Sequence, residues 1–218
     1  MSDERNRRGK LIVVSGFSGA GKGSLMKELL KNYPGQYALS VSVTTRAPRE
    51  TEIDGISYHF KTQEEFDRLV EEGYFIEYAG YTGNCYGTPR PFVEENLDAG
   101  RNVILEIERA GAMIVREKYP DVKMIFITTE NAEILEKRLR DRKTETEEKI
   151  LKRLRTAVTE CDYVKEYHAV IVNDVLEESV ICLHNTIMEE ENGRPSEEDL
   201  KRIDRIREEL KIRLGIQD

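Results

Sequence analysis

The sequence predicts an α/β protein with a central parallel sheet flanked by helices. The run LIVVS, which ends at Ser15, is rich in β-branched residues and too short for a helix. Glycines follow this run at once, and apolar residues at helical spacing come after them. Runs of the same texture recur at residues 103–108, 123–128 and 168–174. Buried strands that alternate with helices in this way favour a parallel sheet.

The first strand is predicted to lead into a helix over residues 24–33, which a Pro-Gly pair at 34–35 ends. The apolar stripe of this helix consists of Leu25, Met26, Leu29 and Leu30. Residues 1–38 are therefore expected to form a first core segment, with a glycine-rich loop between its strand and its helix.

Residues 39–95 differ in texture and predict an inserted, mostly β lobe. Short alternating segments (VSVTTR, ISYHF and FIEYAGY) are separated by glycines, which is typical of strands joined by turns. One helix interrupts them. Thr62 and Glu65 have the spacing of a capping box at its start, and Gly73 is expected to end it.

Core texture resumes over residues 96–130 and 156–188, which hold the remaining predicted strands and a closing helix. Between them, residues 131–155 are dense in arginine, lysine and glutamate. A second capping box, Thr144 with Glu147, is predicted to start a helix there. This charged helical segment is expected to be a small unit apart from the core.

Residues 189–218 are predicted to form a C-terminal helical extension, with a polar linker followed by a charged helix from residue 196. The thin apolar stripe of that helix consists of Leu200, Ile203, Ile206, Leu210 and Leu214. We expect the helix to be a packed or self-associating appendage.

Composition bounds the class of protein. The 218 residues suit one domain, and a net charge of −8 argues against nucleic acid as a partner. No apolar run approaches the roughly 18 residues of a membrane helix, and residues 1–10 do not resemble a secretory signal. Cys85, Cys161 and Cys182 lie far apart, which indicates reduced thiols and a cytoplasmic location.

The glycine-rich loop has the chemistry of a phosphate cradle. Glycines let backbone N–H groups turn toward phosphate oxygens, the next helix presents its positive end, and Lys22 adds a point charge. The residues expected to bind a nucleoside triphosphate here are Gly16, Ser18, Gly19, Ala20, Gly21, Lys22, Gly23 and Ser24. The bland alternative is a turn that merely packs closely.

The loop departs from the usual pattern at one place. A serine or threonine normally follows the lysine and binds Mg²⁺, whereas Gly23 stands here. Ser24, one residue further on, is the candidate ligand for Mg²⁺, directly or through water.

A second group of residues suits a compact dianion. Arg46 and Arg49 offer guanidinium forks that match phosphate oxygens, and Ser42 and Tyr58 add hydroxyl donors. Glu52 belongs to the same segment. Alone, the segment TTRAPR could equally be an exposed turn with solvated cations.

The whole series of motifs resembles the guanylate kinase family. The glycine cradle is followed in order by SVSVTTRAPR, FIEYAGYTGNCYGT, ILEIE, RLRDRKTETEEKILKRL and VIVND. The resemblance covers residues 9–188, and the SxSxTTRxPR block is specific to that family among P-loop kinases. It implies a P-loop kinase fold, with residues 39–95 as a GMP-binding lobe and residues 131–155 as a small helical lid.

The resemblance implies two groups of acceptor residues. The phosphate of GMP would be held by Ser42, Arg46, Arg49, Tyr58 and Tyr86, with Glu52 in the same site. The guanine base would be read by Glu77, Thr88 and Glu108. Guanine offers N1–H and N2–H₂ donors, so carboxylate acceptors suit it, whereas adenine would leave buried carboxylates poorly paired.

The resemblance also implies donor-site roles. Arg138 and Arg142 of the lid, with Arg153 on the next helix, would approach the phosphates of ATP, and Asn173 would contact its adenine. Lys22, Arg46, Arg142 and Arg153 would be the catalytic residues. The implied reaction is Mg²⁺-dependent transfer of the γ-phosphoryl group from ATP to GMP.

Two other functions remain open at this point. One is a guanylate-kinase-like module that binds protein partners without catalysis, and the other is a P-loop kinase for another small phosphate ester. Departures from the family pattern include Phe17 in place of proline, Thr51 and Lys143 in place of glycines, and Glu108 in place of aspartate.

Overall fold

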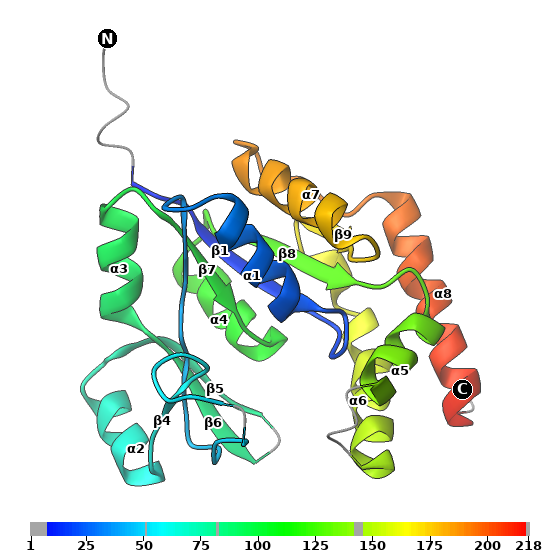
Figure 1. Cartoon of the computed structure of the whole chain (residues 1–218), viewed down its shortest axis with the longest axis horizontal. Helices are drawn as coiled ribbons and strands as arrows, with labels where there is room; N and C mark the ends of the chain where they lie inside the picture. Colours follow the sequence, from blue (N-terminus) through cyan, green and yellow to red (C-terminus); the bar gives the residue numbers. More distant parts are fainter. Residues whose placement is uncertain (1–7, 51, 82, 142–145, 217–218) are drawn as a thin grey trace. The chain divides into compact units, whose positions relative to one another are not determined.

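The computed structural model describes residues 8–50, 52–81, 83–141 and 146–216, and it confirms the α/β class. The main sheet has the strand order β2-β7-β1-β8-β9, and the pairs β2–β7 and β8–β9 are parallel (Figure 1). Its strands are β1 (Leu11–Gly16), β2 (Tyr37–Leu39), β7 (Asn102–Glu106), β8 (Lys123–Thr128) and β9 (Ala169–Val172). Every residue of β1 and β8 is buried, as expected for strands covered on both faces.

The helices follow the sequence pattern closely. They are α1 (Lys22–Asn32), α2 (Gln63–Glu71), α3 (Arg90–Asp98), α4 (Arg109–Lys118), α5 (Ala132–Asp141), α6 (Glu147–Cys161), α7 (Leu176–Met188) and α8 (Glu197–Leu214), with a 3₁₀ turn, η2, at Val164–Glu166. The capping box of Thr62 and Glu65 is present at the start of α2. Helix α1 begins two residues earlier than predicted, directly after Gly21.

The capping box predicted at Thr144 and Glu147 is wrong in its use of Glu147. Thr144 lies outside the described residues, and α6 takes Thr146 as its N-cap without a side-chain cap bond. Glu147 is the first helical residue, and its carboxylate binds Arg140 at 2.5 and 2.8 Å. The ion pair with α5 therefore takes the carboxylate that a capping box would use.

The chain divides into two compact units. The first unit comprises residues 1–13 and 33–122, and the second comprises residues 14–32 and 123–218. Strand β1 continues from the first unit into the second.

The first unit contains a second sheet with the strand order β4-β3-β6-β5. Its strands are β3 (Val43–Thr44), β4 (His59–Phe60), β5 (Phe75–Tyr81) and β6 (Asn84–Pro89). A small core of Val43, Phe66 and Phe75 joins α2 to this sheet, and the rings of Phe66 and Phe75 stack at 4.8 Å. Helix α3 packs on β7, and α4 packs on β5.

In the second unit, α1 packs against α7, and α8 packs against α5, α6 and η2 (Figure 1). Lys123, only 4% exposed, donates from Nζ to the backbone oxygens of Thr186, Glu189 and Glu191. Those carbonyls lie at and just beyond the end of α7, where helical partners run out. The buried ammonium therefore caps α7, which explains how a lysine can lie inside the core.

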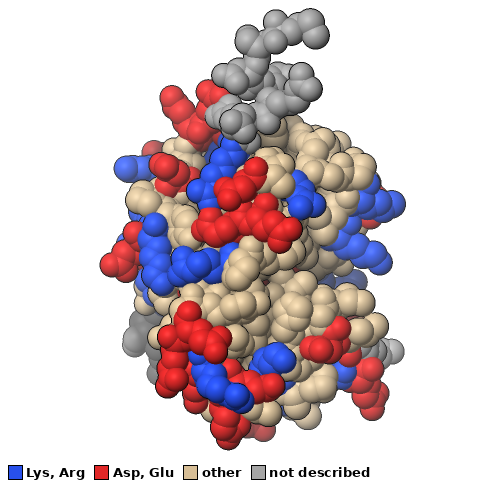
Figure 2. All heavy atoms as spheres, turned by 90° about the vertical axis from the view of Figure 1, so that its left-hand side faces the viewer, with Lys and Arg blue, Asp and Glu red and all other residues tan. Residues whose placement is uncertain are grey.

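The surface agrees with the acidic composition. Figure 2 shows Asp and Glu side chains interspersed with Lys and Arg on the face that it presents, rather than one broad basic area. Among the residues that the structure describes, no helix has both the length and the apolar character needed to cross a membrane.

Candidate active site

The phosphate loop lies between the buried strand β1 and helix α1 of the second unit, and its glycines are required there. Gly19 and Gly21 have φ angles of 98° and 85°, in the region that side chains disfavour. A Cβ on Gly21 would lie 2.5 Å from Nδ2 of Asn173, and one on Gly19 would lie 2.9 Å from Cγ of Leu139. Larger residues at either position would therefore distort the loop.

Lys22 is the first residue of α1, and its ammonium lies over the loop. Nζ donates to the backbone oxygen of Gly16 at 2.7 Å and to that of Phe17 at 3.4 Å. The first turn of α1 has no acidic residue, so its own side chains do not offset the positive end of the helix. Backbone N–H groups, helix end and ammonium together make an anion site suited to phosphates.

Three of the residues predicted for the donor site meet this loop. Arg153 donates from Nη1 to Oγ of Ser18 at 2.5 Å. Arg138 donates from Nη1 to the backbone oxygen of Asn173 at 2.8 Å, and Asn173 donates from Nδ2 to the backbone oxygen of Ala20 at 2.7 Å. Two arginines from different helices thus converge on one loop.

The other predictions for this loop have different outcomes. Arg142 and Lys143 lie outside the described residues. Asn173 is 4% exposed and is held by the loop itself, while its contact with adenine stays a prediction.

The loop fits a magnesium ion that keeps most of its ligands from phosphate and water. The hydroxyl of Ser24 is in the exposed first turn of α1, whereas Gly23 offers no side-chain ligand. The described residues contain no group of three or more His, Cys, Asp or Glu arranged to hold a metal. Mg²⁺ characteristically binds through one or two protein oxygens plus substrate phosphates, so this sparse set of donors is adequate.

In the first unit, the residues predicted to hold a dianion come together around Arg46. The guanidinium lies 5.2 Å from the ring centre of Tyr58 and 5.9 Å from that of Phe60. The rings of Tyr58 and Tyr86 lie 6.0 Å apart. Burial raises the pKa of Tyr58, with the charge of Glu106 acting in the same direction. The phenol therefore stays protonated at neutral pH and can donate to an anion.

Glu52 connects the two arginines of this group. Oε1 accepts a hydrogen bond from Nη2 of Arg46 at 2.8 Å and lies 3.7 Å from Nη1 of Arg49. Oε2 accepts from the backbone N–H of Arg49 at 2.8 Å. Burial acts to raise the pKa of Glu52, but these bonds outweigh it and the pKa is lowered. The carboxylate is thus ionised and fixes Arg46 in place.

Among the described contacts, Ser42 takes part through its backbone. Its carbonyl oxygen accepts a hydrogen bond from the backbone N–H of His59 at 2.9 Å, which joins β4 to the segment before β3. A contact of its hydroxyl with GMP stays a prediction.

Glu77 lies at an irregular point in the hairpin of β5 and β6. Phe75 pairs with Pro89 and Tyr78 pairs with Gly87, so two residues of β5, Ile76 and Glu77, oppose a single residue of β6. This β-bulge breaks the alternation of side chains along β5. Such bulges are common next to active sites, where they redirect a side chain.

The residue of β6 that faces the bulge is Thr88, and its Oγ1 donates to Oε1 of Glu77 at 2.6 Å. Glu77 is 3% exposed and Thr88 is fully buried. Burial raises the pKa of Glu77, although Thr88 and the charge of Lys118 act in the opposite direction. A nearly buried carboxylate of this kind costs folding energy unless donors satisfy it.

Helix α4 completes the surroundings of Glu77. A Cβ on Gly111, in the first turn of α4, would lie only 2.5 Å from Oε2 of Glu77. Lys118, in the last turn, donates to the backbone oxygen of Ile76 at 2.8 Å. Glu108 is the N-cap of α4 and makes no side-chain cap bond. Of the residues predicted to read the base, Glu77 and Thr88 are thus in contact, Glu108 lies at the start of the helix that borders Glu77, and the contacts of all three with guanine stay a prediction.

Sequence reasoning missed several residues that shape the two sites. Neither Gly111 nor Lys118 was among the residues predicted for the site. Phe17 is fully buried against Phe126, with ring centres 4.9 Å apart, so it anchors the loop to β8. The signal for Phe17 was present, since a large apolar residue inside a polar loop must be buried somewhere.

In the second unit, a glycine loop joins a buried strand to a helix that begins with a lysine, and arginines from two other helices contact this loop. This arrangement defines a P-loop phosphotransferase. The first unit contains a second cluster, with two arginines and two tyrosines around Glu52. The family model "Guanylate kinase" matches residues 8–190. This chain belongs to the guanylate kinase family, a family of nucleoside monophosphate kinases.

Individual relatives agree with the family match. A guanylate kinase of Clostridium acetobutylicum is 43% identical over 94% of this chain and 93% of its own length. A guanylate kinase of Rubrobacter xylanophilus is 51% identical over 77% of this chain and 87% of its own. The crystal structure of guanylate kinase from Anaplasma phagocytophilum has a TM-score of 0.69 and 33% identity, and covers 98% of this chain and 99% of that one.

Proposed function

We propose that this protein transfers the γ-phosphoryl group of ATP to the phosphate of GMP, giving ADP and GDP. The bond between the γ-phosphorus and its bridging oxygen breaks, and a phosphate oxygen of GMP forms the new bond. No covalent intermediate with the protein is needed. The protein contributes positioning and charge, which are the main components of catalysis in phosphoryl transfer.

The cluster of the first unit would hold the acceptor. Arg46, Arg49 and the hydroxyls of Tyr58, Tyr86 and Ser42 would bind the phosphate of GMP, with Glu52 keeping Arg46 aligned. Glu77, Thr88 and Glu108 would bind the guanine base. These residues would fix the attacking oxygen, which accounts for a large share of the rate.

The loop of the second unit would hold the donor. Backbone N–H groups and Lys22 would bind the phosphates of ATP, and Arg138, Arg142 and Arg153 would stabilise the charge that develops on the transferred group. When bound, Mg²⁺ would neutralise charge on the β- and γ-phosphates, with Ser24 as the protein ligand, directly or through water. Arginines that arrive from the lid would also exclude water from the reacting phosphate.

The single observation that supports GMP most strongly is the buried carboxylate of Glu77. Its location at a β-bulge, against Thr88 and Gly111, has no evident benefit for stability, since burial raises its pKa. Guanine would offset the cost by donating N1–H and N2–H₂ bonds to carboxylates. Adenine has no such pair of donors at its Watson–Crick edge.

Two alternatives are less well supported. A binding module without catalysis has no use for the ammonium of Lys22 or for Arg153 on Ser18, yet both are in place. A kinase for another phosphate ester would have no need of a buried glutamate beside the acceptor cluster.

The test is an assay of ADP release with ATP, Mg²⁺ and, in turn, GMP, IMP, AMP, CMP and UMP. We expect GMP to react far faster than the others. IMP lacks the 2-amino group of guanine, so it should keep only part of the activity, about 10- to 1,000-fold below GMP in kcat/KM. Equal rates with GMP and AMP would refute the role of Glu77. Silence with all five, from folded protein, would support the binding module.

A further inference from the structure

Helix α8 lies outside the matched family region, which ends at residue 190, yet it is firmly packed in the second unit. Ile203 is 2% exposed, and Ile206 and Leu210 are fully buried. These three residues belong to the apolar stripe predicted from the sequence, while Leu200 and Leu214 at its ends are half-buried. The helix is therefore packed into the hydrophobic core of the second unit.

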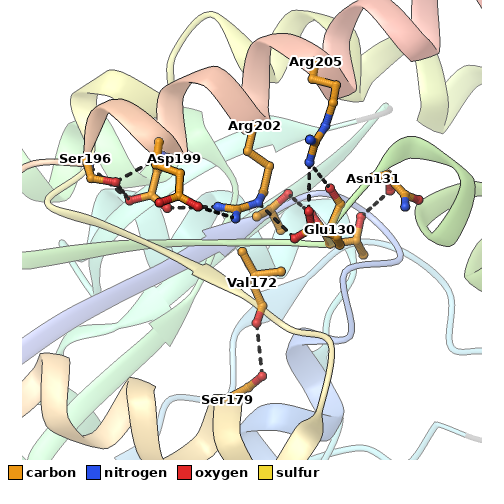
Figure 3. Close-up of polar contacts among 11 residues, drawn as sticks. Glu130, Asn131, Val172, Ser179, Ser196, Asp199, Arg202 and Arg205 are labelled. Carbon is orange, nitrogen blue, oxygen red and sulfur yellow. Dashed lines mark hydrogen bonds and ion pairs between the residues drawn. The ribbon is translucent and has the colours of Figure 1, made fainter.

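Several polar contacts of α8 reach the start of α5 and the residue before it. Figure 3 shows Arg202 and Arg205 extending from α8 to Glu130, which precedes α5; the distances to its carboxylate are 3.0 and 2.8 Å. One turn further along α8, Oε2 of Glu209 accepts a hydrogen bond from the backbone N–H of Ala132 at 3.0 Å. Ala132 is the first residue of α5. Glu209 thus supplies the acceptor that a helix N-terminus lacks.

A further contact joins α8 to the middle of α5. Arg213 donates from Nη1 to Oε2 of Glu136 at 2.9 Å. Glu136 also binds Arg140 at 2.8 Å, and Arg140 binds Glu147 of α6. Helix α8 therefore holds α5 at two places about one turn apart.

The opposite contacts of α5 are with the phosphate loop. Arg138 donates from Nη1 to the backbone oxygen of Ala20 in the loop at 3.4 Å and to that of Asn173 at 2.8 Å. The side chain of Leu139 fills the space beside Gly19. The backbone oxygen of Leu135 would lie 3.3 Å from a Cβ on Gly19. Helix α5 is thus held by α8 while it presents Arg138 and Leu139 to the loop.

We propose that Glu209 is a positioning residue for the donor site: by holding the N-terminus of α5, it fixes Arg138 at the phosphate loop for binding the phosphates of a nucleoside triphosphate. This inference rests on the proposed function only in assigning ATP to the loop. Glu209 itself touches neither the loop nor a substrate in this assignment.

Glu209 is better suited to this role than the other charged residues of α8. A carboxylate at a helix N-terminus satisfies an orphan N–H and interacts well with the helix dipole. The bond is directional and fixes the first backbone group of α5, whereas Arg202 and Arg205 reach Glu130 through long side chains. The neighbouring Glu208 pairs only within α8, with Arg207 at 3.4 Å and Lys211 at 3.5 Å, among the described contacts.

The first experiment compares Glu209→Ala with Glu208→Ala as a matched control. Isothermal titration calorimetry with a non-hydrolysable ATP analogue and Mg²⁺ measures the Kd at the donor site. The same measurement with GMP alone gives the Kd at the acceptor site. We expect Glu209→Ala to raise the Kd of the ATP analogue about three- to tenfold, an effect of the size expected for the loss of a helix cap. The Kd of GMP should be unchanged. Glu208→Ala should match the wild type. Glu209→Gln should recover most of the loss, because its amide oxygen can still accept from Ala132.

The second experiment is a double-mutant cycle with Arg138→Ala. If Glu209 acts through Arg138, Glu209→Ala should change the Kd of the ATP analogue by less than about twofold in the Arg138→Ala background. Thermal unfolding of each variant checks that it is folded. If Glu209→Ala does not fold, Glu209→Asp replaces it, since its shorter side chain retracts the carboxylate.

Three results would overturn the proposal. The losses of affinity for the ATP analogue could be additive in the double-mutant cycle, Glu209→Ala could weaken the binding of GMP and of the ATP analogue equally, or Glu208→Ala could weaken the binding of the ATP analogue as much as Glu209→Ala does. These readouts are binding constants, so they stand apart from turnover. If the wild type bound the ATP analogue but did not phosphorylate GMP, the proposed function would fail while the role of Glu209 could still be decided.

Discussion

Arg46 is the residue on which the acceptor cluster depends. It pairs with Glu52 and lies against Tyr58, so its guanidinium is already oriented before any ligand binds. Replacing it with alanine should lower kcat/KM for GMP about 30- to 1,000-fold, since an aligned charge partner of the phosphate is lost. The Kd of an ATP analogue should change less than about twofold, because Arg46 belongs to the first unit.

Arg68→Ala is the control for this change, since Arg68 is an exposed arginine of the same unit. It should leave kcat/KM for GMP unaltered. Comparable damage to GMP and ATP binding in Arg46→Ala would contradict the placement of Arg46 at the acceptor.

Glu77 should lower stability for the sake of binding. Its raised pKa means that the folded protein keeps a proton at a pH where the unfolded chain has released it. Folding then takes up a proton, so this residue destabilises the protein increasingly as pH rises from the unfolded pKa to the folded one. Glu77→Gln should therefore have a higher free energy of unfolding than the wild type near pH 8, with the gap closing toward about pH 4. Urea denaturation at both pH values measures this.

The control for Glu77→Gln is Glu64→Gln, which should behave with the opposite sign. A backbone hydrogen bond, and to a smaller extent a hydrogen bond with Thr62, lowers the pKa of Glu64. The charge of Glu64 therefore favours folding above the pKa that Glu64 has in the unfolded chain. Removing that charge should not stabilise the protein at pH 8. A gap for Glu77→Gln that widens toward acid would show that its carboxylate is not held at a raised pKa.

A substitution at Gly111 should affect the binding of GMP without a comparable effect on stability. Alanine in place of a helical glycine ordinarily stabilises by up to about 1 kcal/mol. In this case its Cβ would lie 2.5 Å from the carboxylate of Glu77, which would have to move from Thr88. Gly111→Ala should therefore raise the KM for GMP by about tenfold or more while the melting temperature changes little.

Gly80→Ala is the matched control for Gly111→Ala. Gly80 lies on β5, and among the described residues other than its two chain neighbours no atom lies within 4 Å of the position of its missing Cβ. Its KM for GMP should equal that of the wild type. An unchanged KM in Gly111→Ala would show that Glu77 can move without cost.

At the scale of elements, the phosphate loop is held from beneath by an aromatic side chain. Phe17 packs edge-on against Phe126 of β8, which in turn packs against Tyr167 at 5.2 Å. Truncating a fully buried phenylalanine typically costs 3–5 kcal/mol, so Phe17→Ala should lower the free energy of unfolding by about that amount. Urea denaturation with an unchanged m-value checks it. Tyr78→Ala, at a 50% exposed aromatic, should cost much less.

The elements that could be predicted are those whose signal is local. The strand β1, the glycine loop and α1 follow one another along the chain, so burial, turn and helix are each visible in a few residues. The capping box of Thr62 was predicted for the same reason, and that of Ser196, which was not predicted, is equally local. The use of Glu147 could not be predicted in this way, because its carboxylate pairs with Arg140 of another helix instead of capping α6.

The site residues divide in the same way. Lys22 stands in one short motif, and Arg46 and Arg49 stand in another, so each motif was visible in the sequence. The bulge at Ile76 and Glu77 depends on the register of β5 against β6, which no single strand encodes. The bond between Glu209 and Ala132 spans 77 positions of the chain, beyond the reach of local pattern reasoning.

At the scale of the whole molecule, the two predicted sites fall in different compact units. The acceptor residues belong to residues 33–122 and the donor residues to residues 14–32 and 123–218. Each ligand alone should therefore stabilise mainly its own unit against local opening. With GMP at about 100 times its Kd, backbone amides of β5 and β6 should exchange at least about tenfold more slowly.

Hydrogen exchange with GMP alone, with an ATP analogue alone and with inorganic phosphate measures this division. The ATP analogue should slow amides of the phosphate loop and of the start of α1 but leave β5 and β6 nearly unchanged. Equal protection of both units by either ligand would show that the units do not respond separately.

The bulge in β5 has a consequence for how base preference can change during evolution. The side chain of Glu77 is directed by the number of residues between Phe75 and Tyr78, and not only by which residues they are. Deleting Glu77 would restore regular alternation and leave the apolar Ile76 opposite Thr88 in one step. We therefore expect descendants of this protein with a new base preference to differ by an insertion or deletion in this hairpin, rather than by gradual substitution around an unchanged backbone.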